Sequence, residues 1–155
     1  MNQDIENIIL ESLGANQVVN VSLIQNLWSG YGELTRVTTD KGTVILKFIK
    51  FPTERDHPRG WTSDIGHERK KTSYQVEKNW YENLVPVNGA RMAEAIATGI
   101  TGAHEYILLE DLSLSGFTTR YHADWSEVEH CLSWLAHFHR HFLGQQPTGL
   151  WPIGT

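Results

Sequence analysis

Hydrophobic and polar positions follow two different periods along the chain, and each change of period marks an expected element. Residues 4–13 carry Ile and Leu at helical spacing before Gly14, which predicts a short amphipathic helix. Three segments that are rich in β-branched residues are the next predicted elements, as strands: 18–27, 34–39 and 43–51. Gly30 and Gly32, and then residues 40–42, supply the turns that would join these strands as hairpins.

Residues 52–66 are polar and contain Pro and Gly, which indicates a surface loop. Residues 67–84 contain neither Pro nor Gly and return to helical spacing. Tyr74, Glu77 and Trp80 or Tyr81 fall at three- and four-residue steps, so Glu77 is predicted to share a helix face with aromatic side chains.

Two shorter strands are expected next, over residues 92–97 and 106–109, joined by a turn over 98–103. Ser126 and Glu129 have the spacing of a capping box and precede an apolar stripe that ends at Phe142. This pattern predicts a helix of about five turns.

The predicted order is a helix, three strands, a helix, two strands and a long final helix. Five strands with one helix after the third do not fit a doubly wound sheet, in which strands and helices alternate. The order predicts an α+β fold, with a five-stranded antiparallel sheet and a helix between strands 3 and 4 that crosses one face.

Composition narrows the classes of function. The 155 residues carry a net charge of −5 and show no basic face, which argues against nucleic acid as a partner. Cys131 is the single cysteine, so an internal disulfide is excluded. No apolar run reaches the roughly 20 residues that span a bilayer, and the first residues do not resemble a signal peptide. We therefore expect a cytoplasmic protein that does not enter a membrane.

Lys47 stands in the middle of an apolar predicted strand, where an ammonium group needs a partner. Glu77, on the aromatic face of the following helix, is a carboxylate in a similar position, and pairing would relieve part of the desolvation cost of both groups. The alternative is that Lys47 points out of an edge strand and Glu77 lies at a wet margin. Periodicity alone leaves both interpretations open.

The turn that contains Gly30, Tyr31 and Gly32 is a second candidate site. Glycines let backbone N–H groups approach an anion closely, and a turn ahead of a lysine-bearing strand is suited to covering phosphates. Glycines in a hairpin turn are also explained by turn geometry alone.

The remaining candidates favour structural roles. His137, His139 and His141 are two residues apart on a predicted helix, so two of them at most share a face, and their position favours interaction with the helix dipole over a zinc site. Cys131 falls near the apolar stripe and is predicted to be a small buried residue. The three tryptophans Trp80, Trp134 and Trp151 are expected in the core.

The features also occur in a particular order, and five segments carry it: LWSGYGELTR, VILKFIK, SYQVEKNWY, ILLEDL and WLAHFHRHFLG. With these segments the chain resembles the N-terminal lobe of the protein-kinase-like superfamily. The resemblance is narrower to the ecdysteroid-kinase-like small-molecule phosphotransferases, which are relatives of choline kinases and aminoglycoside phosphotransferases. It extends over nearly the whole chain, although Trp28 stands where that family usually has a small residue.

The resemblance implies a role for each candidate. Lys47 would hold the α- and β-phosphates of ATP, Glu77 would hold Lys47, and the Gly30 to Gly32 turn, with Tyr31, would cover the nucleotide. Leu109, Glu110 and Leu112 would belong to the hinge beside adenine. Residues 1–112 would then form the nucleotide-binding lobe, and residues 113–155 a linker and the first helix of an incomplete second lobe.

Such kinases also need a catalytic aspartate, an asparagine five residues later and a further aspartate for Mg²⁺. No Asp in this chain has an Asn five residues on. The resemblance therefore predicts the ATP-binding portion of an enzyme that phosphorylates a small-molecule hydroxyl, inactive by itself, with the Mg²⁺ ligands outside this sequence. The alternative is a non-catalytic binding or regulatory module. If the second lobe is missing, the 126–142 helix is left uncovered, and aggregation, a homodimer through this helix or poor solubility is expected.

Overall fold

The structure is a computed structural model and describes residues 2–51, 64–85, 87–119, 122–146 and 148–151. Within these residues the chain is α+β, with five antiparallel strands and three α-helices. The sheet has the order β1-β2-β3-β5-β4, so β3 is its central strand. The predicted fold class is confirmed at this level.

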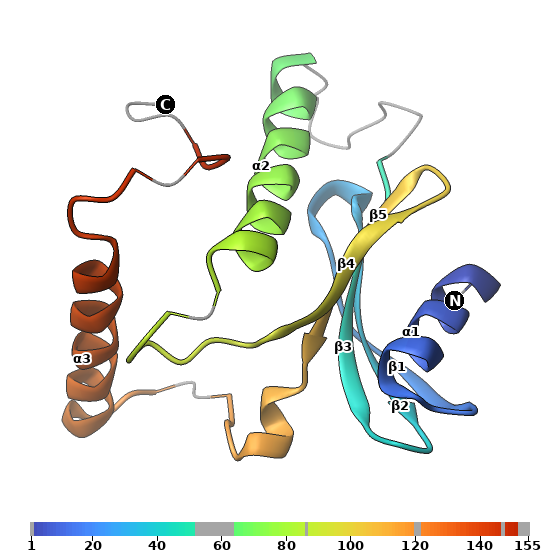
Figure 1. The fold of residues 1–155 in the computed structure, drawn as a ribbon, viewed down its shortest axis with the longest axis horizontal. Coiled ribbons are helices and arrows are strands. Elements are labelled where there is room, and N and C mark those ends of the chain that lie inside the picture. Colours follow the sequence, from blue (N-terminus) through green and yellow to red (C-terminus); the bar gives the residue numbers. More distant parts are fainter. Residues whose placement is uncertain (1, 52–63, 86, 120–121, 147, 152–155) are drawn as a thin grey trace.

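The elements follow one another along the chain in this order: α1 (Gln3–Leu13), β1 (Val18–Asn26), a 3₁₀ turn η1 (Trp28–Gly30), β2 (Gly32–Thr39), β3 (Thr43–Ile49), α2 (Asp64–Asn83), β4 (Ala95–Thr101), β5 (His104–Glu110), a second 3₁₀ turn η2 (Leu112–Ser115) and α3 (Trp125–Phe142). The two longer helices α2 and α3 lie on one side of the sheet and α1 lies on the other (Figure 1). None of the helices in the described ranges is long and apolar enough to cross a bilayer.

The core lies between α1 and one face of the sheet, here called the α1 face. The side chain of Asn2 caps α1 by accepting a hydrogen bond from the Ile5 N–H at 2.9 Å, and Gly14 ends the helix in the left-handed conformation. Alternate residues of each strand point to this face. The buried cluster that results consists of Ile5, Ile9, Val37, Val44, Leu46, Phe48, Tyr106 and Leu108.

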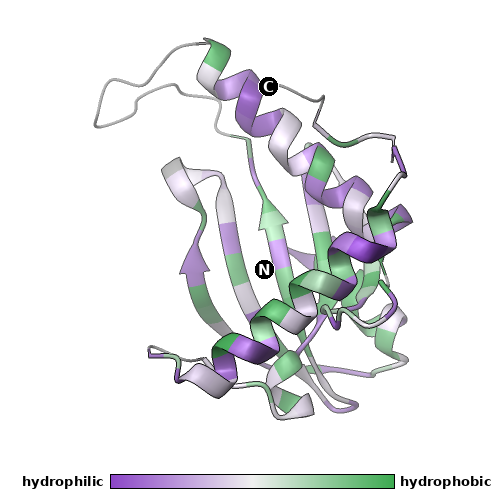
Figure 2. Ribbon diagram, turned by 90° about the vertical axis from the view of Figure 1, so that its left-hand side faces the viewer, coloured by the Kyte–Doolittle hydropathy of each residue, from purple (hydrophilic) through white to green (hydrophobic). Residues whose placement is uncertain are grey.

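The opposite face of the sheet, here called the α2 face, carries the odd-numbered residues of β3. Ile49 and Ile107 are fully buried there. The Oγ1 of Thr98, in β4, donates a hydrogen bond of 2.5 Å to Glu82 of α2, which joins this helix to the outer strand of the sheet. Seen from the side of α3, hydrophobic and hydrophilic residues are interspersed along the helices (Figure 2).

The last two strands differ from their predicted bounds of 92–97 and 106–109. The turn lies at Gly102, which has a φ of 59°, rather than over residues 98–103. Gly99 is a strand residue: a Cβ at this position would lie 2.6 Å from the hydroxyl oxygen of Tyr106. The glycine is therefore explained by the close approach of Tyr106 across the strands and not by a turn.

Three further predictions need correction. The capping box of α3 is formed by Asp124 and Glu127, not Ser126 and Glu129, because the helix begins two residues earlier. Cys131 is exposed. Of the predicted loop over residues 52–66, the last three residues belong to α2, and residues 52–63 lie outside the described ranges.

Candidate functional site

Lys47 and Glu77 form an ion pair between the central strand and α2. The Lys47 ammonium donates hydrogen bonds of 2.6 and 2.5 Å to the two carboxylate oxygens of Glu77. The two side chains are 16% and 33% exposed, so both charges have lost much of their hydration and each depends on the other. The predicted contact is present, and the alternative of a lysine on an edge strand is wrong because β3 is central.

The ion pair leaves part of the ammonium group available. A lysine carries three N–H donors, and Glu77 takes two of them. The group is therefore a positive charge of fixed position with one remaining donor, on the α2 face of the sheet. Such a group is chemically suited to hold one oxygen of an anion, phosphate included.

Aromatic rings lie against this pair. The Lys47 Nζ lies 5.2 Å from the ring centroid of Tyr74, which is a cation–π distance, and Tyr74 stacks on Tyr31 at 6.0 Å. Burial, with a smaller contribution from the negative charge of Glu77, raises the pKa of Tyr74. Tyr74 therefore remains neutral at physiological pH, and its π-face stays available to the cation.

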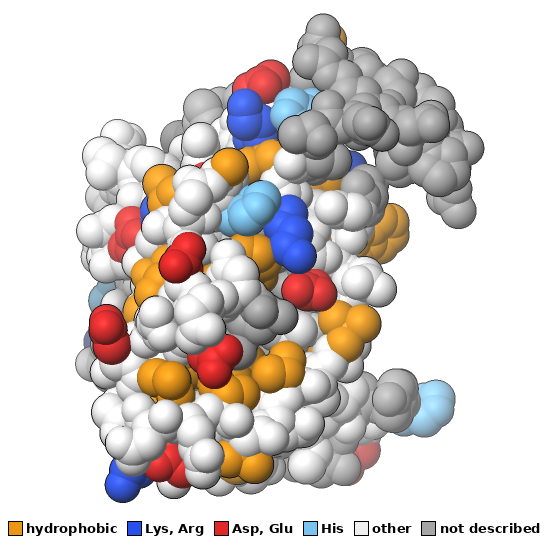
Figure 3. All heavy atoms as spheres, turned by 90° about the vertical axis from the view of Figure 1, so that its right-hand side faces the viewer, with side chains coloured by type: hydrophobic (Ala, Val, Ile, Leu, Met, Phe, Trp, Pro, Cys, Tyr) orange, Lys and Arg blue, Asp and Glu red, His pale blue; other side chains and the backbone are white. Residues whose placement is uncertain are grey.

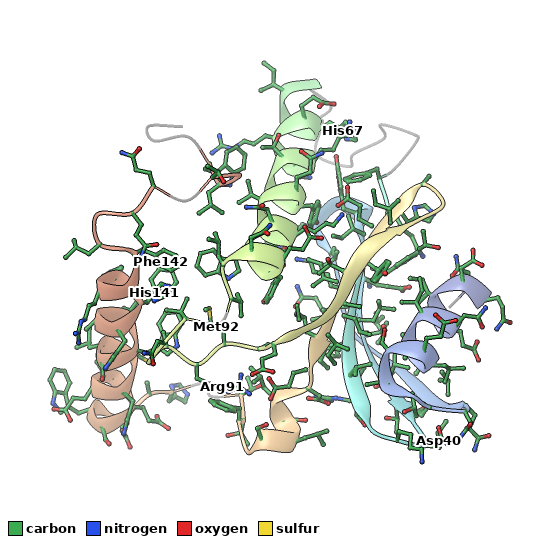
Figure 4. All side chains as sticks on the ribbon, in the orientation of Figure 1. Asp40, His67, Arg91, Met92, His141 and Phe142 are labelled. Carbon is green, nitrogen blue, oxygen red and sulfur yellow. The ribbon has the colours of Figure 1, made fainter. Side chains whose placement is uncertain are left out.

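The ring of Tyr31 joins the glycine turn to α2. Its side chain is 5% exposed, and its hydroxyl forms a hydrogen bond of 2.6 Å with Nδ1 of His67, in the first turns of the helix. Figure 4 shows His67 near the N-terminal end of α2. Asp40, which follows β2, lies at the opposite end of the molecule. No sequence pattern predicted this contact, because two residues 36 positions apart in a polar context carry no signal of proximity.

Gly30 and Gly32 both have positive φ angles, of 74° and 121°. A Cβ at Gly32 would lie 2.0 Å from the carbonyl oxygen of Phe48, whereas a Cβ at Gly30 would meet nothing within 4 Å. The backbone of the turn is held on both sides, since Leu27 N donates to the Gly32 carbonyl at 2.8 Å and Lys50 N to the Tyr31 carbonyl at 3.0 Å. The turn therefore lies against the end of β3.

Leu109, Glu110 and Leu112 lie at the C-terminal end of β5, here called the exit of β5. Leu109 is buried and pairs with Ile45 of β3, while Leu112 begins η2. Glu110 forms an ion pair with Arg91, and this hydrogen bond is the main reason that the pKa of Glu110 is lowered. Arg91 and the adjacent Met92 lie in the segment between α2 and β4 (Figure 4).

An ion pair between Arg36 and Asp111 was likewise not predicted from the sequence. Arg36 of β2 donates to the carboxylate of Asp111 at 2.7 Å from Nε and at 3.3 Å from Nη2, and the Asp111 side chain is 3% exposed. Burial by itself raises the pKa of Asp111, but the hydrogen bonds from Arg36 and Ser113 outweigh it and the pKa is lowered. The pair fixes the exit of β5 to the middle of β2.

The histidines of α3 do not come together as a site. His137 Nδ1 lies 2.8 Å from the Ser133 carbonyl oxygen, one turn earlier in its own helix. Within the described ranges, no group of three or more His, Cys, Asp or Glu side chains could hold a metal ion. Trp80 packs against Phe138 and Phe142, at ring-centroid distances of 5.5 and 5.4 Å, which is a partly buried contact between α2 and α3. Trp151, which was expected in the core, is 39% exposed.

No protein-family model, no curated protein and no solved structure matches the chain. Its chemistry must therefore be inferred from its own residues. The features that the structure brings together are the ion pair between Lys47 and Glu77, the glycine turn beside it and the exit of β5 on the same sheet.

Proposed function

We propose that this chain is the ATP-binding portion of a small-molecule kinase, which transfers the γ-phosphoryl group of ATP to a substrate hydroxyl. The observation that carries the proposal is the ion pair between Lys47 of the central strand and Glu77 of the helix that follows it, with hydrogen bonds of 2.5 and 2.6 Å. In the kinase arrangement a lysine on the third strand, oriented by a helix glutamate, holds the α- and β-phosphates. The remaining N–H donor of Lys47 fits this role.

Two neighbouring features support the proposal. Gly32 pairs with Ile49, two residues after Lys47, so the glycine turn lies at the end of β3 where phosphates held by Lys47 would be. Ile45 and Leu109 are cross-strand partners and share the face of Lys47, which offers an apolar surface for the adenine ring. The backbone from Glu110 to Leu112 would then hydrogen-bond the edge of the base.

The proposal assigns no catalytic base and no Mg²⁺ ligand to this chain, since no Asp in the sequence has an Asn five residues later. Mg²⁺ would neutralise charge on the phosphates when bound, and this chain contributes Lys47, Glu77 and the turn. We also propose residues 1–112 as the nucleotide-binding lobe and residues 113–155 as a linker and the first helix of a second lobe. Because no Asp is followed by an Asn at this spacing, a second candidate function is a non-catalytic regulatory module with the same architecture.

Calorimetric titration of the chain with ATP, with and without Mg²⁺, tests the proposal. We expect Lys47→Ala to weaken ATP binding at least about tenfold, because a charge-assisted hydrogen bond contributes about 1.5–3 kcal/mol. Lys50→Ala is the matched control, since Lys50 belongs to the same strand segment but lies over Phe48 on the α1 face. Equal affinity of Lys47→Ala and the unmodified chain would contradict the role of Lys47. A folded chain that binds no nucleotide would favour the regulatory module.

A further inference from the structure

A cavity lies on the α1 face of the sheet, opposite Lys47. It has a volume of about 460 Å³, within the range of about 300–1,000 Å³ that is typical of small-molecule sites. Leu46 and Phe48 of β3 and Lys50, which follows the strand, line it, and because side chains alternate along a strand, Lys47 points to the other face. The cavity is therefore separate from the proposed nucleotide site.

Half of the lining residues are apolar, and two of these are accessible to solvent. Ile5 of α1 and Leu46 and Phe48 of β3 form the closed part, and Val21 and Leu23 of β1 form the open part. Val21 and Leu23 are 43% and 56% exposed, because α1 does not extend over this edge of the sheet. Figure 3 shows this side of the molecule, where hydrophobic side chains reach the surface between charged and polar ones.

The polar groups of the lining include two that lack partners. Thr35 is 7% exposed, and its Oγ1 has no hydrogen-bond partner among the described residues. Nδ1 of His104 is likewise buried and unpaired within the described part of the chain. A buried hydroxyl without a partner destabilises a folded protein, so its presence in a cavity wall indicates a partner that is supplied from outside the chain.

The other polar groups of the lining favour an anion. Lys50 supplies a positive charge at the rim and lies 3.6 Å from Glu33, which also lines the cavity and whose negative charge it compensates. Asn2, the N-cap of α1, also lines the cavity, which places the positive end of a helix dipole there. Thr35, Lys50 and a suitable tautomer of His104 are all donors.

We propose that this cavity binds a small monocarboxylic acid with an unbranched apolar chain. The carboxylate accepts hydrogen bonds from Thr35 and His104 and lies near the charge of Lys50. The alkyl chain lies against Ile5, Phe48 and Val21. The site takes one ligand and is independent of the binding of ATP.

Calorimetric titration of the chain with octanoate tests the proposal, with octylamine as a probe of equal chain length and opposite charge. We expect octanoate to bind and octylamine not to bind over the same concentration range. Thr35→Val keeps the shape of the buried side chain but removes the donor, and it should weaken octanoate binding about five- to tenfold, as expected for one hydrogen bond. The melting temperature of Thr35→Val should not fall, because the substitution removes an unpaired hydroxyl.

Val21→Trp provides a second test that does not alter a polar group. The indole would fill the open part of the cavity, so octanoate binding should be lost. Val19→Trp is the matched control: Val19 is on the same strand and is 61% exposed, but does not line the cavity. It should bind octanoate as the unmodified chain does.

Three outcomes would overturn the proposal: no octanoate binding by the folded chain, equal binding of octylamine, or unchanged octanoate affinity in both Thr35→Val and Val21→Trp. Loss of ATP binding in Lys47→Ala with octanoate affinity intact is expected, since the two sites lie on opposite faces of the sheet.

Discussion

At the scale of single residues, the two lysines near the end of β3 show how alternation along one strand separates two environments. Lys47 is 16% exposed and pairs with Glu77 on the α2 face. Lys50, three residues later, is nearly half exposed and lies 5.1 Å from the ring centroid of Phe48 on the α1 face. The same residue type therefore has two different roles, which its partners determine.

Among the described residues, Gly32 is one where the local backbone is tightly constrained. Gly32→Ala should destabilise the chain by about 3 kcal/mol, because a Cβ would lie 2.0 Å from the Phe48 carbonyl oxygen at a φ of 121°. Gly30→Ala should cost about 1 kcal/mol, the strain of the left-handed conformation alone, since its Cβ would meet open space. Urea unfolding of both variants measures the difference. Equal losses would show that the contact with Phe48 does not constrain the turn.

At the scale of elements, α2 and the exit of β5 are each fixed to the sheet by a small number of polar contacts. The helix is joined near its two ends, by His67 to Tyr31 and by Glu82 to Thr98, with Glu77 to Lys47 between them. The exit of β5 is joined to β2 by Asp111 and Arg36. The geometry of the proposed site therefore depends on side-chain contacts between elements as well as on the strand ladder.

The pair of Arg36 and Asp111 should make the stability of the chain dependent on pH. The pKa of Asp111 is lower in the folded chain than in the unfolded chain. The ionised carboxylate therefore stabilises the fold above the unfolded pKa of about 4, and this stabilisation is lost as the pH falls through the folded pKa. Asp111→Asn should lose about 1.5 kcal/mol at pH 7.

Thermal unfolding of the unmodified chain and of Asp111→Asn between pH 7 and pH 3 measures this contribution. The difference in melting temperature between the unmodified chain and Asp111→Asn should shrink as the pH falls. Arg36→Met should reduce stability at pH 7 in the same way, and a difference that is constant across the range would contradict the assignment.

At the scale of the whole molecule, α3 contacts the rest of the chain through one narrow strip. Nε1 of Trp134 donates to the Arg91 carbonyl at 2.8 Å, and Phe138 and Phe142 pack on Trp80. Figure 4 shows Phe142 and His141 at the end of α3 nearest to α2. Among the described residues of this helix none is buried, and Leu132 and Leu135 are 56% and 41% exposed.

We therefore expect the chain to self-associate through α3, because burying exposed leucines in a dimer removes apolar area from water. Sedimentation equilibrium at several concentrations measures this. A double variant of Leu132→Glu and Leu135→Glu should be monomeric, while Leu114→Glu, at a leucine of η2 that is 69% exposed, should behave as the unmodified chain. A monomer at all concentrations would favour the self-contained regulatory module.

The sequence by itself determined the number of strands and α-helices and one contact of the site. Hydrophobic periodicity depends on local geometry, with a period of 2 in strands and 3.6 in helices, so it predicted the five strands and the three α-helices. Lys47 and Glu77 could be paired because each stood out as a charge in an apolar context. The predicted boundaries of β4 and the predicted cap of α3 were wrong. A glycine such as Gly99 fits a turn or a strand, and a serine such as Ser126 fits a helix cap or the first turn of a helix.

Tertiary structure alone decided which distant residues meet. The pairs of Tyr31 with His67 and of Arg36 with Asp111 join residues whose local contexts are unremarkable, so no pattern along the chain indicates them. The same is true of the cavity on the α1 face, whose lining comes from α1 and four strands. The physical reason is that periodicity specifies which face a side chain occupies, whereas strand order and helix placement specify what lies opposite that face.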